Sequence, residues 1–276
     1  MTRGLQRTTF NRSGLVRILS ETLPEAIDPH YDFGQRLGQW LDFTDALDLF
    51  SVLNAGQGAA SVVHEKPAAT GNPLSEQLAR TRRNLTDAIH NDGVFGGAEP
   101  TKIRFPTPLP QATPESAADF SPYHRYYLAH QRDMSAAIAA LRANARKALA
   151  KHSPAHRQLA ELDLAFEKSL AARERNLLAT IPMHLAKRFA QRYADHRSSL
   201  PDDTPDGPAT RTTPGSWLEA FCHDAQAVLL AELDLRLKPV AGLIAALGEA
   251  APHTMELDAN YKHNKNKYSV YIILPF

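Results

Sequence analysis

The amino-acid sequence predicts an all-α fold, a helical bundle built around one long antiparallel helical hairpin. Apolar residues recur at helical spacing over most of the chain, and no repeat period is present. The two longest helical stretches, residues 122–151 and 154–181, carry apolar seams that match each other across a turn at His152-Ser153. Proline-rich stretches separate the hairpin from the other helices and predict long loops between them.

The first region, residues 1–92, is predicted to contain three helices. A short helix is expected over 14–23, and a second, longer one over 33–53. Residues 56–73 are rich in Gly, Ala and Pro, which predicts a loop. Leucines and an isoleucine at helical spacing then predict the third helix over 74–91.

The hairpin region is predicted over 122–197 and follows a Pro-rich linker at 93–121. The residues predicted to face each other across the hairpin are Tyr127 and Leu177, Met134 and Leu170, Ile138 and Phe166, Leu141 and Leu162, and Ala145 and Leu159. This pairing predicts a shared apolar seam along both helices. An alternative is that the long helices dimerise as a coiled coil.

Pro182 is expected to kink the second hairpin helix, because proline removes one backbone hydrogen bond and clashes with the carbonyl of Leu178. Beyond the kink, residues 183–196 have a rotated apolar face. We expect this face to pack against the helix at 33–53.

The last region is predicted to be a C-terminal helix over 216–248 that packs on the hairpin. A second Pro-rich linker over 198–215 precedes it, and Pro239 is expected to divide it into two pieces. The tail at 249–276 differs in composition from the rest of the chain, with three Asn, three Lys and three Tyr in residues 260–276. A frameshift or readthrough would account for this switch, and a native edge strand is the alternative.

One polar layer interrupts the apolar seam of the hairpin. Gln131 is predicted to lie opposite Arg173, with Asp133 nearby, and His130 is predicted opposite Glu174. A charged residue on a packing face must be paired, so we expect an ion pair between Arg173 and Asp133. The layer is interpreted as a device that fixes the register of the helices, and a buried polar functional site is the alternative.

A basic face is predicted on the first hairpin helix, where Asp133 is the single opposing acid. Its members are Arg125, Arg132, Arg142, Arg146, Lys147 and Lys151. Helical geometry places these residues opposite the apolar seam, in solvent, where a phosphate backbone or an acidic protein is able to reach them. The last helix shows the reverse pattern, with the acidic residues Glu219, Asp224, Glu232 and Asp234.

The composition excludes several classes of protein. The chain has 276 residues, a formal net charge of +1 and one cysteine, Cys222, so it holds no internal disulfide framework and no thiolate zinc cluster. No apolar run approaches the roughly 18 residues that a membrane helix requires. A reducing cytoplasm is the expected compartment.

The sequence contains none of the common catalytic or cofactor motifs. The Glu-x-x-His pairs of di-iron bundles, the glycine-rich phosphate loops and the Gly-x-Ser-x-Gly elbow are all missing. His152 and His156 have an i,i+4 interval but straddle the Ser153-Pro154 turn. We therefore expect no enzyme, no cofactor and no intrinsic metal site.

Short motifs over most of residues 10–247 have a recognisable pattern. They are Ser13-Gly-Leu-Val-Arg17, Phe33-x-x-Arg-Leu-x-x-Trp40-Leu41 with Thr44-Asp45-Ala46, Tyr126 with Gln131-Arg132 and Met134, Ser153-Pro154, Leu159-Ala160-x-Leu162-Asp163, Arg173-Glu174, Leu177-Leu178-Ala179, Ile181-Pro182, Arg188-Phe189, and Leu233-Asp-Leu-Arg-Leu237 with Pro239. These motifs resemble those of an uncharacterised proteobacterial family, a domain of unknown function without an assigned activity. Members of that family are often encoded beside envelope-associated membrane proteins, so the resemblance implies a cytoplasmic accessory role.

The sequence thus favours a non-enzymatic helical adaptor or scaffold that acts through protein–protein contacts. The expected partner is a protein, either a member of an envelope-associated complex or a second copy of the chain. The alternative is a nucleic-acid-associated accessory protein that uses the basic face of the helix at 122–151.

Overall fold

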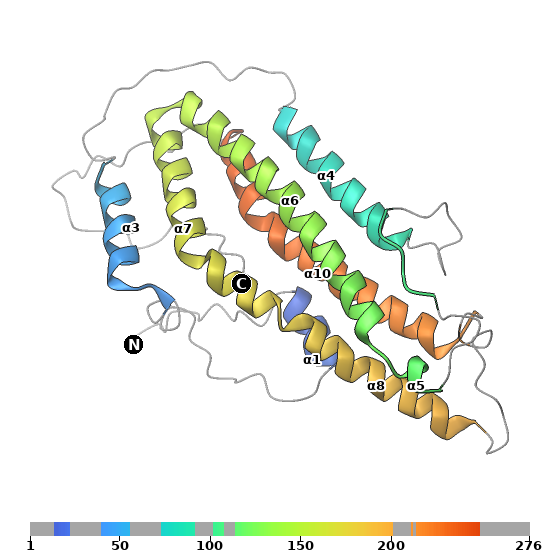
Figure 1. Cartoon of the computed structure of the whole chain (residues 1–276). Helices are drawn as coiled ribbons and strands as arrows, with labels where there is room; N and C mark the ends of the chain where they lie inside the picture. The colour runs from blue at the N-terminus through green and yellow to red at the C-terminus, as the bar shows by residue number, and fades with distance from the viewer. Residues whose placement is uncertain are drawn as a thin grey trace, which may run out of the picture.

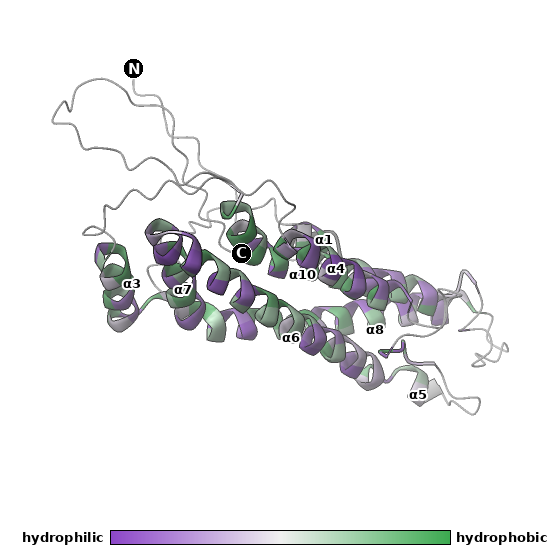
Figure 2. Ribbon diagram, turned by 90° about the horizontal axis from the view of Figure 1, so that it is seen from above, coloured by the Kyte–Doolittle hydropathy of each residue, from purple (hydrophilic) through white to green (hydrophobic). Residues whose placement is uncertain are grey.

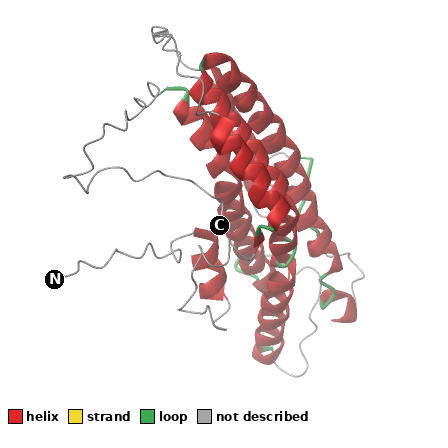
Figure 3. Ribbon diagram, turned by 90° about the vertical axis from the view of Figure 1, so that its left-hand side faces the viewer, coloured by secondary structure: helices red, strands yellow, loops and turns green. Residues whose placement is uncertain are grey.

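The computed structural model describes residues 14–22, 40–55, 73–91, 102–107, 114–200, 211 and 214–248. Within these residues every regular element is a helix and no strand occurs, which confirms the predicted all-α class (Figure 3). The helices are α1 (Gly14–Thr22), α3 (Phe43–Ala55), α4 (Pro73–His90), α5 (Pro114–Ala117), α6 (Ser121–His152), α7 (Pro154–Leu178), α8 (Ile181–Ser199) and α10 (Trp217–Ala246). The predicted tail at 249–276 and most of the predicted linkers lie outside the described residues.

The antiparallel hairpin is formed by α6 and α7, which run side by side in opposite directions (Figure 1). Ser153 makes the turn in an extended conformation, with φ −158° and ψ 166°, and its hydroxyl accepts a hydrogen bond from the His156 amide at 3.2 Å. Pro154 then occupies the first turn of α7, where a missing N–H costs nothing. The predicted turn at His152-Ser153 is therefore confirmed.

The second hairpin helix is bent, as predicted from Pro182. Helix α7 ends at Leu178 and α8 begins at Ile181, so the break covers Ala179 and Thr180, and Ile181 separates it from the proline. Pro182 lies in the first turn of α8, where its fixed φ suits helix initiation. The bend changes the direction of the chain between α7 and α8 and brings α8 against α10 and α6.

The predicted contact between residues 183–196 and the helix at 33–53 is wrong. The described part of that N-terminal helix, α3, packs against α7, whereas α8 packs against α10. Phe189 of α8 is buried beside Trp217 and Phe221, with ring centroids 5.2 and 5.1 Å away. The bend therefore directs the apolar face of α8 toward the start of α10.

Helix α10 is the centre of the bundle and contacts α1, α4, α6, α7 and α8. It is buried on several sides, as a helix in the middle of a bundle must be. The predicted division at Pro239 does not occur, because α10 continues to Ala246. Pro239 is itself buried between Leu237 and Val240, so we attribute the unbroken helix to packing that offsets the roughly 3 kcal/mol cost of an internal proline.

The apolar seam of the hairpin is asymmetric. On α6 all five predicted seam residues are buried, whereas on α7 only Leu170 is buried, and Leu159 and Leu177 are exposed. Because α10 also packs on α6, the buried face of α6 is shared between α10 and α7. The α6 half of the predicted seam is therefore confirmed, and the α7 half is wrong at its two ends.

The N-terminal helices are close to their predicted bounds, with one difference. Trp40 is helical, but Leu41 and Asp42 are not, and α3 begins at Phe43. A reciprocal cap explains this start, since the Asp45 amide donates to Asp42 Oδ1 at 2.8 Å and the Asp42 amide donates to Asp45 Oδ2 at 3.3 Å. One continuous helix over 33–53 is therefore wrong at 41–42.

Candidate functional site

A buried polar cluster lies where α6 and α10 meet at the bend between α7 and α8. We call it the Glu232 cluster, and its members are Tyr127, Gln131, Glu232 and Arg236. Glu232 has an exposed fraction of 0%. Its carboxylate accepts hydrogen bonds from the Tyr127 hydroxyl at 2.7 Å, from Gln131 Nε2 at 3.0 and 3.1 Å, and from Arg236 Nε at 2.7 Å. These donors from two helices are what makes a buried carboxylate tolerable.

Gln131 connects this cluster to the bend. Its Nε2 also donates to the Leu178 carbonyl at 3.1 Å. In a regular helix that carbonyl would accept from the amide four residues later, but residue 182 is proline and has no N–H. Gln131 therefore supplies the hydrogen bond that Pro182 removes from the backbone.

The predicted polar layer is correct at Gln131 and wrong at its partner. Gln131 meets Leu178 and Glu232, whereas Arg173 is exposed on α7. Among the described residues no ion pair joins Arg173 to Asp133. The bend and α10 together explain why Gln131 has other partners than predicted. The bend leaves the Leu178 carbonyl without a backbone donor, and α10 brings the Glu232 carboxylate next to Gln131, whereas the prediction considered only the two hairpin helices.

His130 and Glu174, the pair predicted to face each other in this layer, have different neighbours. His130 is buried beside Tyr126, with ring centroids 4.7 Å apart. Glu174 lies on the side of Arg236 and Arg142. Burial raises the pKa of Glu174, although Arg236 and Arg142 oppose this rise through their positive charges. Of the five predicted residues, Gln131 is the one that belongs to the Glu232 cluster as defined above.

Two residues of the predicted basic face are not free in solvent. Arg142 donates from Nε to Asp163 Oδ2 at 2.9 Å and from Nη2 to Asp163 Oδ1 at 2.6 Å, in the bidentate geometry that favours Arg–carboxylate pairs. Arg146 donates from Nη1 to Asp163 Oδ2 at 2.9 Å and also to Glu167. Their placement opposite the apolar seam is wrong. Each follows a buried residue, Leu141 or Ala145, by one position and so lies at the margin that faces α7.

The remaining four cations of this face, Arg125, Arg132, Lys147 and Lys151, are exposed as predicted. Arg125 lies near the start of α6, while Lys147 and Lys151 lie near its end. The four thus do not form one continuous track, because the pairs of Arg142 and Arg146 with α7 lie between them.

Helix α3 carries an exposed apolar face at the edge of the bundle (Figure 2). Phe43, Leu47 and Phe50 recur at i, i+4 and i+7, so they project from one side of the helix, and Leu53 lies beside them. Their exposed fractions are 78%, 50%, 64% and 51%. We call this surface the α3 face. Helical periodicity predicts a helix in this part of the chain, but it does not show that these side chains are exposed.

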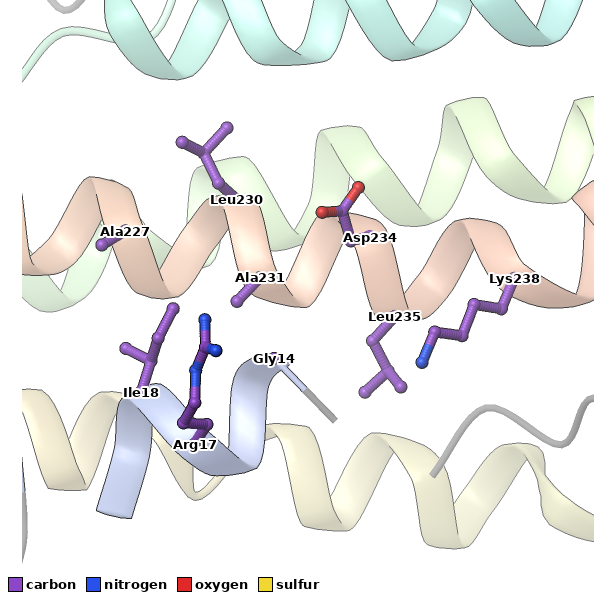
Figure 4. Close-up of a pocket in the computed structure, with 9 residues that line it drawn as sticks. All are labelled: Gly14, Arg17, Ile18, Ala227, Leu230, Ala231, Asp234, Leu235 and Lys238. Carbon is purple, nitrogen blue, oxygen red and sulfur yellow. The ribbon is translucent and has the colours of Figure 1, made fainter. Parts of the chain in front are cut away.

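A shallow groove of about 470 Å³ separates α1 from α10. Figure 4 shows Arg17 and Ile18 extending from α1 toward Ala231, with Leu235 and Lys238 of α10 at the other end of the groove. Its lining mixes both signs of charge, and its acid, Asp234, forms an ion pair with Arg82 at 3.0 Å. The groove therefore has no clear preference for a charged ligand.

No group of three or more His, Cys, Asp or Glu side chains in the described part of the chain is placed to hold a metal ion. Cys222 is fully buried in the core, as a small apolar residue would be. Among the described helices, none combines the length and hydrophobicity that crossing a membrane requires.

Together these observations define a class of protein. It is an all-α bundle in which the buried polar groups stabilise contacts between helices, and its candidate binding sites lie on exposed surfaces. The chain belongs to a family described as a protein of unknown function, DUF3348, whose model matches residues 1–249. The atypical tail predicted from composition lies almost wholly beyond that match. Comparison with curated proteins gave no match, and neither did comparison with solved structures.

Proposed function

We propose that this protein is a non-enzymatic bacterial adaptor or scaffold that acts in the cytoplasm through protein–protein contacts. The observation that carries the proposal is the α3 face, where Phe43 and Phe50 expose more than half of their surface. Large apolar side chains gathered on one exposed helix face are typical of a surface that a partner covers. We favour a protein of an envelope-associated complex as this partner, with a second copy of the chain as the other candidate.

The nucleic-acid alternative has less support, because Arg142 and Arg146 bind carboxylates of α7. The four cations of this face that stay exposed are at separated positions, so they would bind a phosphate backbone weakly. A filter-binding assay at low salt tests it directly. Retention of DNA or RNA that falls steeply as salt rises would favour this alternative over the adaptor.

Site-specific photocrosslinking in the native host tests the adaptor. We would replace Phe50 or Leu47 with p-benzoylphenylalanine, and Arg83, an exposed residue of α4, in a matched control. We expect both α3 positions to give the same crosslinked protein, identified by mass spectrometry, and the Arg83 position to give none. Absence of crosslinks from both α3 positions, or an identical product from Arg83, would contradict the proposal.

A further inference from the structure

A basic groove lies between the segment 102–107 and the first turns of α6. It has a volume of about 510 Å³. Lys102, Ile103, Arg104 and Pro106 form one wall, and residues from the start of α6, including Arg125 and Tyr126, form the other. The segment runs beside the bundle at the end where α6, α8 and α10 approach one another (Figure 1).

The wall formed by residues 102–107 is held against the bundle by Phe105, whose exposed fraction is 1%. The Phe105 ring lies against Tyr123 and Tyr126, with centroids 5.2 Å from each, and against Phe221 at 6.5 Å. On either side of Phe105 in the chain, Arg104 is exposed and Pro106 is half-buried, and both line the groove. The aromatic contacts thus position the basic wall.

All charged residues that line the groove are positive. Lys102, Arg104 and Arg125 are exposed, and none of the three forms an ion pair within the described residues. The acid nearest in sequence to Arg125 is Asp119, which lies outside the lining, accepts a hydrogen bond from the Ser121 amide at 2.9 Å and interacts with the positive charge of Arg125. The positive end of the α6 dipole lies at the same place and adds to the field.

We propose that this groove binds an extended acidic segment of a protein partner. Lys102 and Arg104 on one wall and Arg125 on the other contact its carboxylates, while Ile103, Pro106 and the α6 wall receive an intervening aliphatic side chain. The inference rests on the proposed adaptor function and specifies the chemistry of a partner. The groove and the α3 face share no residue, so the test of one surface can fail while the test of the other succeeds.

The groove favours a peptide over a nucleic acid for two reasons. Binding of single-stranded nucleic acid commonly relies on exposed aromatic rings on which bases stack, whereas Tyr126, the aromatic residue of this lining, has an exposed fraction of 4%. The cations that would extend the groove into a phosphate track along α6, Arg142 and Arg146, are already bound to Asp163.

Fluorescence anisotropy with the purified full chain tests the proposal. The probe is a fluorescein-labelled hexapeptide, Glu-Asp-Leu-Glu-Asp-Leu, and the control probe has lysine in place of each acid. We expect the acidic probe to bind and to weaken as salt rises, and the basic probe not to bind. The triple variant Lys102→Ala, Arg104→Ala, Arg125→Ala is expected to lose about tenfold in affinity.

A matched triple variant, Lys147→Ala, Lys151→Ala, Lys168→Ala, removes the same charge from exposed positions elsewhere. We expect it to bind like the unchanged protein. Equal binding by both triple variants, or no binding of the acidic probe at low salt, would overturn the proposal. An oligothymidylate that binds more tightly than the peptide and is lost in the first variant would replace it with a nucleic-acid site.

Discussion

Replacing Gln131 with leucine isolates the polar contacts that hold the bend, because the two side chains have similar volumes. The Leu178 carbonyl and the Glu232 carboxylate each lose a donor that lies 3.0–3.1 Å away in the native protein. An unpaired buried carbonyl costs about 1–3 kcal/mol, and the lost bond to a carboxylate costs about 1.5–3 kcal/mol. Since Tyr127 and Arg236 still donate to Glu232, we expect Gln131→Leu to lower the free energy of unfolding by about 2–4 kcal/mol.

Urea unfolding followed by far-ultraviolet circular dichroism measures this loss on the full chain. The matched control is Gln191→Leu on the exposed side of α8, which we expect to change stability by less than about 0.5 kcal/mol. A loss for Gln131→Leu below about 1 kcal/mol, or one equal to that of the control, would refute this account of the cluster.

A double-mutant cycle with Pro182→Ala separates the two contacts of Gln131. Alanine restores an N–H at position 182, which lets the backbone donate to the Leu178 carbonyl once the bend relaxes. We therefore expect Gln131→Leu to cost about 1 kcal/mol less in the Pro182→Ala background than in the native chain. Additive effects would show that Gln131 does not serve the carbonyl freed by Pro182.

Three further predictions concern α3, α6 and α7. Arg142→Met leaves Asp163 without its bidentate partner, so we expect urea unfolding to show a loss of roughly 1–3 kcal/mol, against almost none for the exposed control Arg132→Met. Burial raises the pKa of Glu174, so the folded state binds the proton of this carboxyl more tightly than the unfolded state does. The contribution of Glu174 to stability therefore falls as pH rises from its unfolded pKa through its folded pKa. Glu174→Gln is therefore expected to gain stability relative to the native chain at neutral pH, with the difference shrinking toward acidic pH in parallel unfolding curves, and a constant difference would argue against it. Asp42→Ala removes half of the reciprocal cap, so we expect faster amide hydrogen exchange in α3 while exchange in α10 is unchanged.

The local features of the fold were predictable because a few neighbouring residues determine each of them. Ser153-Pro154 combines a cap with a proline in the first turn, and this pair alone specifies where α6 ends and α7 begins. Pro182 likewise specifies the bend through its missing N–H. The capping pair Asp42 and Asp45 was equally local, and a search for reciprocal caps would have found the start of α3.

The Glu232 cluster was not predictable in the same way, because its members are about a hundred positions apart in the chain. Periodicity shows that Gln131 lies on the buried side of α6, but it does not show which helix meets it there. The sequence grouped Glu232 with the other acids of the last helix, Glu219, Asp224 and Asp234. Its position next to the buried Leu233, with Arg236 one turn later, is the one signal that indicated a buried ion pair.

The two proposed surfaces lie at opposite ends of the hairpin. The basic groove adjoins the start of α6, whereas Gln158 in the first turns of α7 donates to the Leu53 carbonyl at 2.9 Å and so places α3 near the end of α6. With 32 residues, α6 is roughly 48 Å long at the usual helical rise, so most of this length separates the two surfaces. A scaffold needs this separation, and it needs a core that keeps the surfaces at a constant spacing. The Glu232 cluster and the Arg142 pair lie on α6 between the two surfaces and hold it to α10 and α7.

Substitutions in the α3 face should therefore leave peptide binding in the groove unchanged. A measured coupling between the α3 face and the groove would show that the bundle itself changes shape on binding.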